Sequence, residues 1–387
     1  MTGDVIDPRL KKFRDKKIKH IHLEIPLNKL IRLAVSARPE SIIVFTGPGG
    51  SGKTTTLDAL KKHLRHVFAD RMQRDPGFLP YLSIEAVAGL DGNFNWKDGL
   101  TRTLSSAGEI LINQKALNRF EADLDGEKVA HLRSLVREEL RRALEHLVRF
   151  REIPILIIDE ASAILLGKNA MAPLLQFEIL KSLAVQIKIP ILLCGAYDLL
   201  GILDGTGQLV RRSDVVHLSR YLVDGTTESH NDAGELVPIP DRDHFRNAVA
   251  TLLESMDVEK EVDFLLYLDY FLMKSIGCIG NLKDWLDRGL VETLATPARI
   301  LTRDIIMKAA LPNKTLIRLT NEALIGEKIL RELPDDDLAH LMGYVNVPTL
   351  DSISGSPAVH QQTNSPKQKR RPGQRGPSRD PIGGLHA

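Results

Sequence analysis

Short, mainly apolar runs alternate with stretches of helical periodicity along the chain as far as residue 218. The runs, which are typical of strands covered on both faces of a parallel sheet, lie at 42–46, 79–87, 155–158, 191–194 and 214–218. Between them, apolar residues recur with a period of about 3.6 residues at 54–66, 127–150 and 174–186. This alternation predicts an α/β fold: a doubly wound, five-stranded parallel sheet with right-handed crossovers.

After residue 238 the pattern contains helices only. They are expected at 241–253, 264–273, 281–290, 301–310 and 316–330, and they predict a small all-α lid. From about residue 352 the chain is rich in Ser, Pro, Gly, Gln and Arg and is too poor in apolar residues to offset chain entropy, so this basic tail is expected to be disordered. The expected parts are a basic N-terminal segment at 1–25, the sheet domain at 26–238, the lid at 239–332 and a C-terminal extension at 333–387, with a loop at 223–240.

The formal net charge of +2 is unevenly distributed along the chain. Residues 9–19 carry a net charge of +6 and residues 355–387 a net charge of +5, which leaves −9 on the rest. Two basic ends on an acidic middle indicate a polyanionic partner. The alternative is that charged ends keep the chain soluble.

The cysteines and the lengths of the apolar runs indicate the cellular compartment. Two isolated cysteines, Cys194 and Cys278, lie in apolar stretches and favour a reducing environment without disulfides. No apolar run approaches the roughly 20 residues that span a bilayer, and no apolar region of a secretory signal follows the N-terminus. We therefore expect a cytoplasmic protein with no membrane partner.

The apolar run 42–46 leads directly into a glycine-rich loop that matches the P-loop pattern G-x-x-x-x-G-K-[ST] at every fixed position. Its glycines permit a tight turn whose N–H groups point at phosphate oxygens, and the next helix directs its N-terminal dipole at the same phosphates. Lys53 is expected to reach the β- and γ-phosphates and Thr54 to ligate Mg²⁺, so ATP and Mg²⁺ are the predicted cofactors. The residues expected to bind the nucleotide are Gly47, Gly49, Gly50, Ser51, Gly52, Lys53, Thr54, Thr55 and Asp159.

Two acids, Asp159 and Glu160, follow the apolar run 155–158. An acid at the end of such a strand, about 100 residues after a P-loop, completes the Mg²⁺ site. Glu160 is placed to polarise an attacking water as a general base, which favours hydrolysis over phosphoryl transfer to a small acceptor. The alternative is a pair of acids that caps a helix.

Two further positions are candidates for completing the site. After the run 191–194, Tyr197 or Asp198 falls where P-loop ATPases of the AAA+ class often carry a polar sensor, with a helix cap by Asp198 as the alternative. Arg211 and Arg212 precede the run 214–218, at an edge that faces the neighbouring subunit in ring ATPases. Either is therefore a candidate arginine finger acting in trans, and a surface pair is the alternative.

Four blocks of the sequence resemble the TnsC/TniB-type AAA+ regulators of transposition. They are TGPGGSGKTT at 46–55, LIIDEA at 156–161, LLCGAYDL at 192–199 and SIGCIGNLKDWL at 275–286. The first two are shared by very many ATPases, whereas the last two are more specific, because two glycines leading into an amphipathic lid helix are similar to this family. The resemblance covers residues 20–310 and implies an AAA+ P-loop NTPase fold.

The resemblance also implies a bacterial, DNA-associated ATPase. In that family, ATP-bound subunits form rings or helical filaments on duplex DNA of any sequence, link a target-selector protein to transposase subunits, and disassemble when ATP is hydrolysed. Lys97 and Arg102 fall where relatives follow the DNA backbone, although Trp96-Lys97-Asp98 also fits the start of a surface helix. Many AAA+ lids carry a sensor arginine; here that position lies near Gly280-Asn281, and Lys283 is the nearest cation.

The basic tail is expected to recruit a transposase subunit, with DNA as the alternative partner. The competing interpretation of the whole chain is another AAA+ DNA-associated ATPase, such as a replication initiator or helicase loader. These proteins usually carry a C-terminal winged-helix domain, for which residues 312–387 offer too little strand pattern. A signalling or defence ATPase would need a further effector domain, and Glu160 and the lid argue against a small-molecule kinase.

Overall fold

The computed structural model describes residues 7–89, 92–109, 126–165, 172–204, 211, 213–230, 235–332 and 334–343. The chain divides into two compact units, Met1–Leu330 and Arg331–Ala387, which are described separately. The first unit contains the sheet, the helices around it and the lid. In the second unit the described helix is α16 (Asp335–Leu341).

Within the described ranges, no helix combines the length and the apolar character that a membrane span requires.

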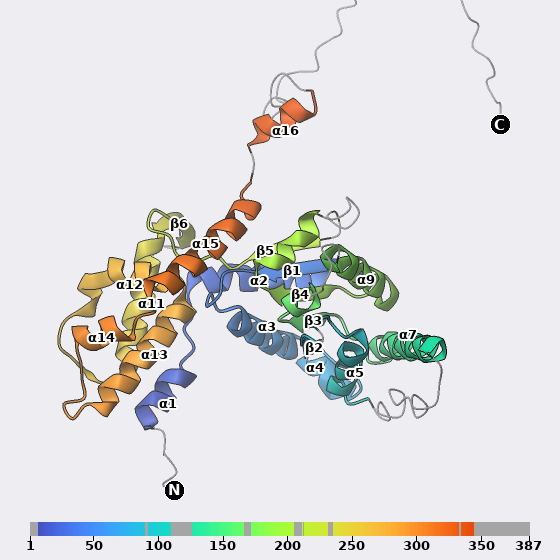
Figure 1. Ribbon diagram of the computed structural model, residues 1–387, viewed down its shortest axis with the longest axis horizontal. Helices are drawn as coiled ribbons and strands as arrows, with labels where there is room; N and C mark the ends of the chain where they lie inside the picture. Colours follow the sequence, from blue (N-terminus) through green and yellow to red (C-terminus); the bar gives the residue numbers. More distant parts are fainter. Residues whose placement is uncertain are drawn as a thin grey trace, which may run out of the picture. The chain divides into compact units, whose positions relative to one another are not determined.

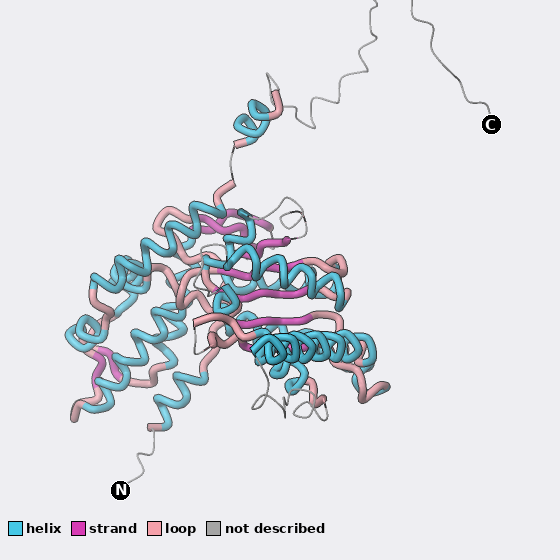
Figure 2. Tube along the Cα trace, turned by 45° about the vertical axis from the view of Figure 1, so that its right-hand side comes forward, coloured by secondary structure: helices cyan, strands magenta, loops and turns pink. Residues whose placement is uncertain are grey.

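Five parallel strands form one sheet in the order β2-β3-β4-β1-β5, as Figures 1 and 2 show. The strands are β1 (Ile42–Thr46), β2 (Leu82–Glu85), β3 (Leu156–Asp159), β4 (Ile191–Gly195) and β5 (Ser213–His217). The predicted α/β class and five-stranded parallel sheet are thereby confirmed. Strand β2 is shorter than the predicted run 79–87 because it lies at the edge of the sheet and pairs only with four residues of β3.

Alternate residues of the central strands enter two different cores, one on each face of the sheet. Ile42 and Val44 pack in a cluster with α5, α7 and α9, whereas Ile43 and Phe45 pack against α2 and α3. Because helices cover both faces of the sheet (Figure 2), the central strands β1 and β4 are apolar at consecutive positions, 42–45 and 191–194. The helices of the two layers are α2 (Ile21–Ser36), α3 (Lys53–Val67), α5 (Trp96–Ser106), α7 (Gly126–Phe150) and α9 (Ala172–Ile187), with the short α4 (Ala69–Arg74), α8 (Ser162–Leu165) and η2 (Tyr197–Asp204) between them.

The lid is a group of helices that share one core (Figure 1), formed around Phe245, Phe271 and Trp285. The helices of this core are α11 (Asp241–Ser255), η3 (Phe264–Tyr267), α12 (Leu268–Ser275), α13 (Ile279–Ala295) and α14 (Arg303–Ala309). The last lid helix, α15 (Asn313–Leu330), lies outside this core, and its Ala323 packs with Tyr197 and Leu200 of η2. Two strands, β8 (Glu259–Lys260) and β9 (Ile300–Leu301), also form a short parallel pair in this region, where the sequence predicted helices only.

An antiparallel hairpin lies in the segment that was predicted to be a loop. It is formed by β6 (Thr226–His230) and β7 (Leu236–Pro240), with Thr226 opposite Pro240 and Glu228 opposite Pro238. The sequence pattern missed it because proline within a run normally argues against a strand. In a two-stranded hairpin each strand has a free edge, so these prolines are tolerated.

The N-terminal segment is attached to the lid through α1 (Pro8–Asp15). Phe13 is fully buried in the lid core, and Arg14 makes a bidentate ion pair of 2.8 and 2.9 Å with Asp287 of α13. Lys17 pairs with Asp58 of α3, on the sheet domain. We call residues 8–19 the N-terminal strap, because they connect the lid to the sheet domain. The sequence predicted a polyanionic partner for the cations of this segment, but two of them, Arg14 and Lys17, form ion pairs within the chain.

A buried polar network joins α2 to the lid. His22 Nε2 lies 3.2 Å from a carboxylate oxygen of Asp241, and the Thr227 hydroxyl donates to the same oxygen at 2.7 Å. The other ring nitrogen of His22 lies 3.2 Å from the Ser219 carbonyl oxygen, and Tyr221 stacks on the imidazole with ring centroids 4.0 Å apart. This network fixes the junction between the sheet domain and the first lid helix.

Candidate nucleotide site

The P-loop connects the end of β1 to α3, and two glycines determine its path. Gly50 and Gly52 have φ angles of +76° and +104°, in the left-handed region that residues with a Cβ rarely adopt. Because α3 begins at Lys53, the first N–H groups of this 15-residue helix have no partners within the helix and are directed at the loop. The buried hydroxyls of Thr46 and Ser51 have no hydrogen-bond partner within the described part of the chain. These donors fit a phosphate group.

Lys53 lies over the loop. Its Nζ donates to the carbonyl oxygens of Gly47 at 2.8 Å and Pro48 at 3.0 Å. The Thr54 side chain, one residue further along α3, is exposed. An ammonium held at the loop and a free hydroxyl at the start of the helix are the groups that a nucleotide phosphate and its Mg²⁺ require.

The acidic pair stands at the carboxyl end of β3. Asp159 is half-buried and accepts a hydrogen bond from the Glu160 backbone N–H at 2.9 Å, whereas the Glu160 side chain is exposed. Burial raises the pKa of the Cys194 thiol, and the charge of Asp159 raises it further, while the Lys53 ammonium acts in the opposite direction. The ends of β3 and β4 and the P-loop lysine therefore share one electrostatic environment. The sequence did not suggest Cys194 as a neighbour of this site, because it stands in an ordinary apolar run.

Tyr197 and Asp198, the candidate sensor residues, have structural partners. Asp198, in the first turn of η2, accepts hydrogen bonds from the Leu199 N–H at 3.0 Å and from the Ser162 hydroxyl at 2.6 Å. The Tyr197 hydroxyl lies 2.9 Å from His217 Nε2, and its ring packs against Gly326 of α15. Asp198 therefore stabilises the start of η2 from within the helix, and Tyr197 connects β5 with α15.

Arg211 is exposed and directly precedes β5. Ser213 is opposite Ile42, the first residue of β1, so Arg211 lies at the amino end of these strands, whereas the P-loop follows their carboxyl end. A pocket of 530 Å³ between Arg211, Asp214 and the chain before β1 marks this opposite edge. Within one subunit Arg211 is therefore remote from the P-loop. Arg212 lies outside the described residues.

Lys97 and Arg102 belong to α5, which begins at Trp96. The Asn95 side chain caps this helix by accepting from the Lys97 N–H at 3.0 Å, and Arg102 pairs with Asp98 at 2.8 Å with both side chains about half exposed. The segment Trp96-Lys97-Asp98 is therefore the start of a helix at the surface. DNA contact by these two cations stays a prediction.

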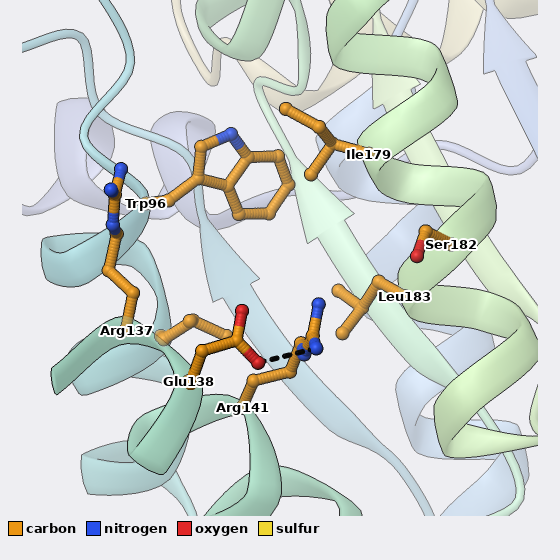
Figure 3. A pocket seen from close by; sticks show the side chains of 8 residues that line it. Trp96, Arg137, Glu138, Arg141, Ile179, Ser182 and Leu183 are labelled. Atoms are coloured by element: carbon orange, nitrogen blue, oxygen red, sulfur yellow. Dashed lines mark hydrogen bonds and ion pairs between the residues drawn. The ribbon is translucent and has the colours of Figure 1, made fainter. Parts of the chain in front are cut away.

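A second pocket, of 220 Å³, lies between α5, α7 and α9 (Figure 3). Trp96, Leu183 and Ile179 supply apolar walls, and an ion pair of 2.5 Å between Arg141 and Glu138 closes one side. Polar residues of α7, the arginine-rich helix predicted at 127–150, thus line part of this pocket. No P-loop residue lines it, so it is separate from the nucleotide site.

The lid contacts the P-loop at the start of α13, a contact that the sequence did not predict. The Gly280 N–H donates to the Gly50 carbonyl oxygen at 2.8 Å. The Asn281 side-chain amide lies 3.4 Å from the Gly49 carbonyl oxygen and 3.3 Å from that of Ser275. A Cβ on Gly280 would collide with the Gly50 carbonyl, so glycine is required there. The glycines of the block at 275–286 were the signal in the sequence.

Lys283, the lid cation nearest to this contact in the sequence, is bound elsewhere. Its Nζ donates to the carbonyl oxygens of Arg14 and Lys16, each at 2.7 Å, and burial lowers its pKa. Lys283 therefore holds the end of α1 in the N-terminal strap and is not directed at the P-loop.

The sheet order, the P-loop after β1 and the helical lid define an AAA+ P-loop NTPase fold. Residues 37–203 match the family described as an AAA domain. No curated protein matches the sequence.

Solved structures of P-loop ATPases are similar to the chain at low identity. The ORC2 protein of Aeropyrum pernix is 14% identical over 90% of this chain and 87% of its own, with a TM-score of 0.46. The Walker-type ATPase paby2304 of Pyrococcus abyssi is 16% identical over 85% and 80%, with a TM-score of 0.44. A RuvB mutant of Thermotoga maritima is 16% identical over 84% and 80%, with a TM-score of 0.33.

Proposed function

We propose that this protein binds ATP with Mg²⁺ and hydrolyses it. Lys53 and the N–H groups of the P-loop would bind the phosphates, and Thr54 and Asp159 would hold Mg²⁺, whose charge would neutralise that of the phosphates. Glu160 accepts the proton of the attacking water. Its exposed side chain, next to Asp159 at the end of β3, supports this role.

We further propose that hydrolysis controls DNA transposition. In the ATP state, subunits assemble on duplex DNA of any sequence, link a target-selector protein to transposase subunits, and leave when ATP is hydrolysed. One observation carries this proposal. The block SIGCIGNLKDWL, on which the resemblance to transposition regulators depends, is the lid segment whose Gly280 bonds to the P-loop. A lid in contact with the nucleotide loop is the part of the chain that can convert nucleotide state into a change of assembly.

Assembly supplies a role for Arg211. Its exposed position at the edge opposite its own P-loop supports a function in trans, in which it stabilises charge at a neighbour's γ-phosphate. Arg211→Ala protein then has a complete nucleotide site but no finger, and Lys53→Ala protein has the reverse defect. A mixture that regains no ATPase activity over the separate proteins would contradict this role.

The experiment that tests the proposed function is electron microscopy of negatively stained protein with duplex DNA, in ATP or ADP, together with phosphate release. Wild-type protein is expected to assemble on DNA in ATP only, with an affinity that falls steeply with salt because phosphate contacts release counterions. Glu160→Gln should keep ATP binding, hydrolyse slowly and remain assembled. Lys53→Ala, the control that cannot hold the phosphates, should neither bind ATP nor assemble. Wild-type phosphate release by Glu160→Gln would refute the general base, and tight binding to one DNA sequence in ADP would refute the regulator.

A further inference from the structure

The P-loop exposes two carbonyl oxygens to the lid. Asn281 Nδ2 donates to the Gly49 carbonyl oxygen, and the Gly280 N–H donates to the Gly50 carbonyl oxygen. Both donors stand in the first turn of α13, and the Asn281 side chain packs so closely on the loop that a Cβ on Gly50 would collide with it. The contact is therefore an interlocked surface of four residues, without a charged group.

The orientation of these peptides has a consequence for phosphate binding. In a trans peptide the C=O and the next N–H point to opposite sides. A Gly49 carbonyl that is bound to the lid turns the Gly50 N–H toward the inner side of the loop. The Gly280 N–H holds the carbonyl of the next peptide, between Gly50 and Ser51, and the Ser51 N–H donates within the loop to the Pro48 carbonyl oxygen at 3.3 Å. The lid thus acts on the N–H groups that cradle a phosphate.

We infer that Asn281 is a positioning residue that holds the P-loop in its phosphate-binding conformation, an inference that rests on the proposed binding of ATP at this loop. Asn281 does this through the peptide between Gly49 and Gly50 and has no contact with the γ-phosphate. Lys283, the lid cation nearest to Asn281 in the sequence, donates instead to the carbonyl oxygens of Arg14 and Lys16. The lid contact therefore depends on the conformation of the P-loop. A lid cation at the nucleotide would depend instead on the charge of the γ-phosphate.

A positioning role for Asn281 and a sensor role at the γ-phosphate predict different changes in nucleotide affinity and kcat. The P-loop N–H groups contact the phosphates that ATP and ADP share. Loss of the neutral hydrogen bond from Asn281 to the Gly49 carbonyl oxygen should therefore weaken the binding of ATP and ADP equally, by about 3- to 10-fold, with an unchanged kcat at saturating ATP. A cation on the γ-phosphate would affect ATP alone and would lower kcat.

The test measures the Kd of fluorescent ATP and ADP analogues, with KM and kcat for hydrolysis, in two variants. Asn281→Ala removes the side chain, and Asn281→Leu keeps its approximate size, adds no charge and cannot donate a hydrogen bond; leucine is also a good helix former, so this variant should fold. Asn247→Leu, at an exposed site on α11, is the matched control for the loss of an amide in the lid, and Lys283→Ala should leave both affinities unchanged.

An equal loss of affinity for both nucleotides in the two Asn281 variants supports the inference. Wild-type affinities in both, a loss confined to ATP, or a fall in kcat at saturation would overturn it. If wild-type protein binds neither nucleotide, the proposed function fails instead, and the two failures are therefore distinguishable.

Discussion

Two of the contacts that attach the lid to the rest of its unit are built from different interactions. The N-terminal strap uses side chains: Phe13 is buried in the lid core, and Arg14 forms a bidentate ion pair with Asp287. The P-loop contact uses glycine backbone and one neutral amide. Burial of a large aromatic ring stabilises by several times as much as a neutral hydrogen bond. The strap is therefore suited to hold the lid permanently, and the P-loop contact to form and break with the state of the loop.

The largest effect that separates the two attachments is expected from Phe13→Ala. Truncation of a fully buried aromatic ring costs about 3–5 kcal/mol, here from the lid core that Phe13 shares with α11 and α13. We expect a lower Tm for the lid and an unchanged nucleotide Kd measured below the transition, since the P-loop is not touched. Differential scanning calorimetry and fluorescent nucleotide titration measure the two quantities. A nucleotide affinity that falls with the Tm would show that the two attachments act as one.

An effect of intermediate size is expected at His20 when the pH is lowered, because its protonation should reduce the free energy of unfolding. Burial, and then the neighbouring His22, lower the pKa of His20 to about 4. His20 stands between the strap and α2, and its ring nitrogen lies 3.2 Å from the Tyr221 hydroxyl. Between pH 4 and its ordinary value the unfolded state binds more protons, so stability should rise with pH in this window and fall as pH is lowered through it.

Urea denaturation at pH 7 and pH 5 measures this dependence. The contribution of His20 is expected to be on the order of 1 kcal/mol at pH 5, after allowance for its partial exposure. His20→Gln should remove that part of the loss. His217 and His244 have pKa values lowered in the same direction by burial, so a remaining dependence of the same sign is expected in the variant. Identical pH profiles of the two proteins would contradict the assignment to His20.

The smallest effect is expected from Arg14→Ala. The ion pair with Asp287 is partly exposed, so its loss should cost less than about 1 kcal/mol, and less still in high salt. Chemical denaturation in urea at low and high ionic strength checks both statements, with Lys12→Ala, which removes a more exposed pair, as the control. A loss of several kcal/mol that shrinks in high salt would mean that the strap is held mainly by charge and not by Phe13.

Much of the fold followed from the sequence because it depends on local patterns. A parallel strand covered on both faces must be apolar at consecutive positions, so Ile42–Thr46 and Ile191–Gly195 were visible as runs. The P-loop was visible because few residue types fit its turn. The hairpin β6–β7 was missed because its prolines argued against a strand in isolation, and a strand pair is a property of two segments.

Local sequence patterns could not predict the contacts between segments that lie far apart in the chain. Nothing local to Asn281 indicates that it meets Gly49, and nothing near Lys283 indicates that its partners are carbonyls at the end of α1. The charge of residues 9–19 indicated a polyanionic partner, whereas the structure gives Arg14 and Lys17 carboxylate partners in α13 and α3. Charge counts record how many cations a segment has, but not which of them are already paired.

The backbone conformation of Glu160 determines which substitutions at this position would stabilise the fold. Its φ angle is +48°, a conformation that costs a residue with a Cβ about 1 kcal/mol or more relative to glycine. Selection for stability alone would therefore replace this glutamate by glycine or asparagine. A long, exposed acid at such a position is a trade-off between stability and activity of the kind found where a side chain is kept for what it does. Variants selected for heat resistance without selection for function would be expected to lose this residue early.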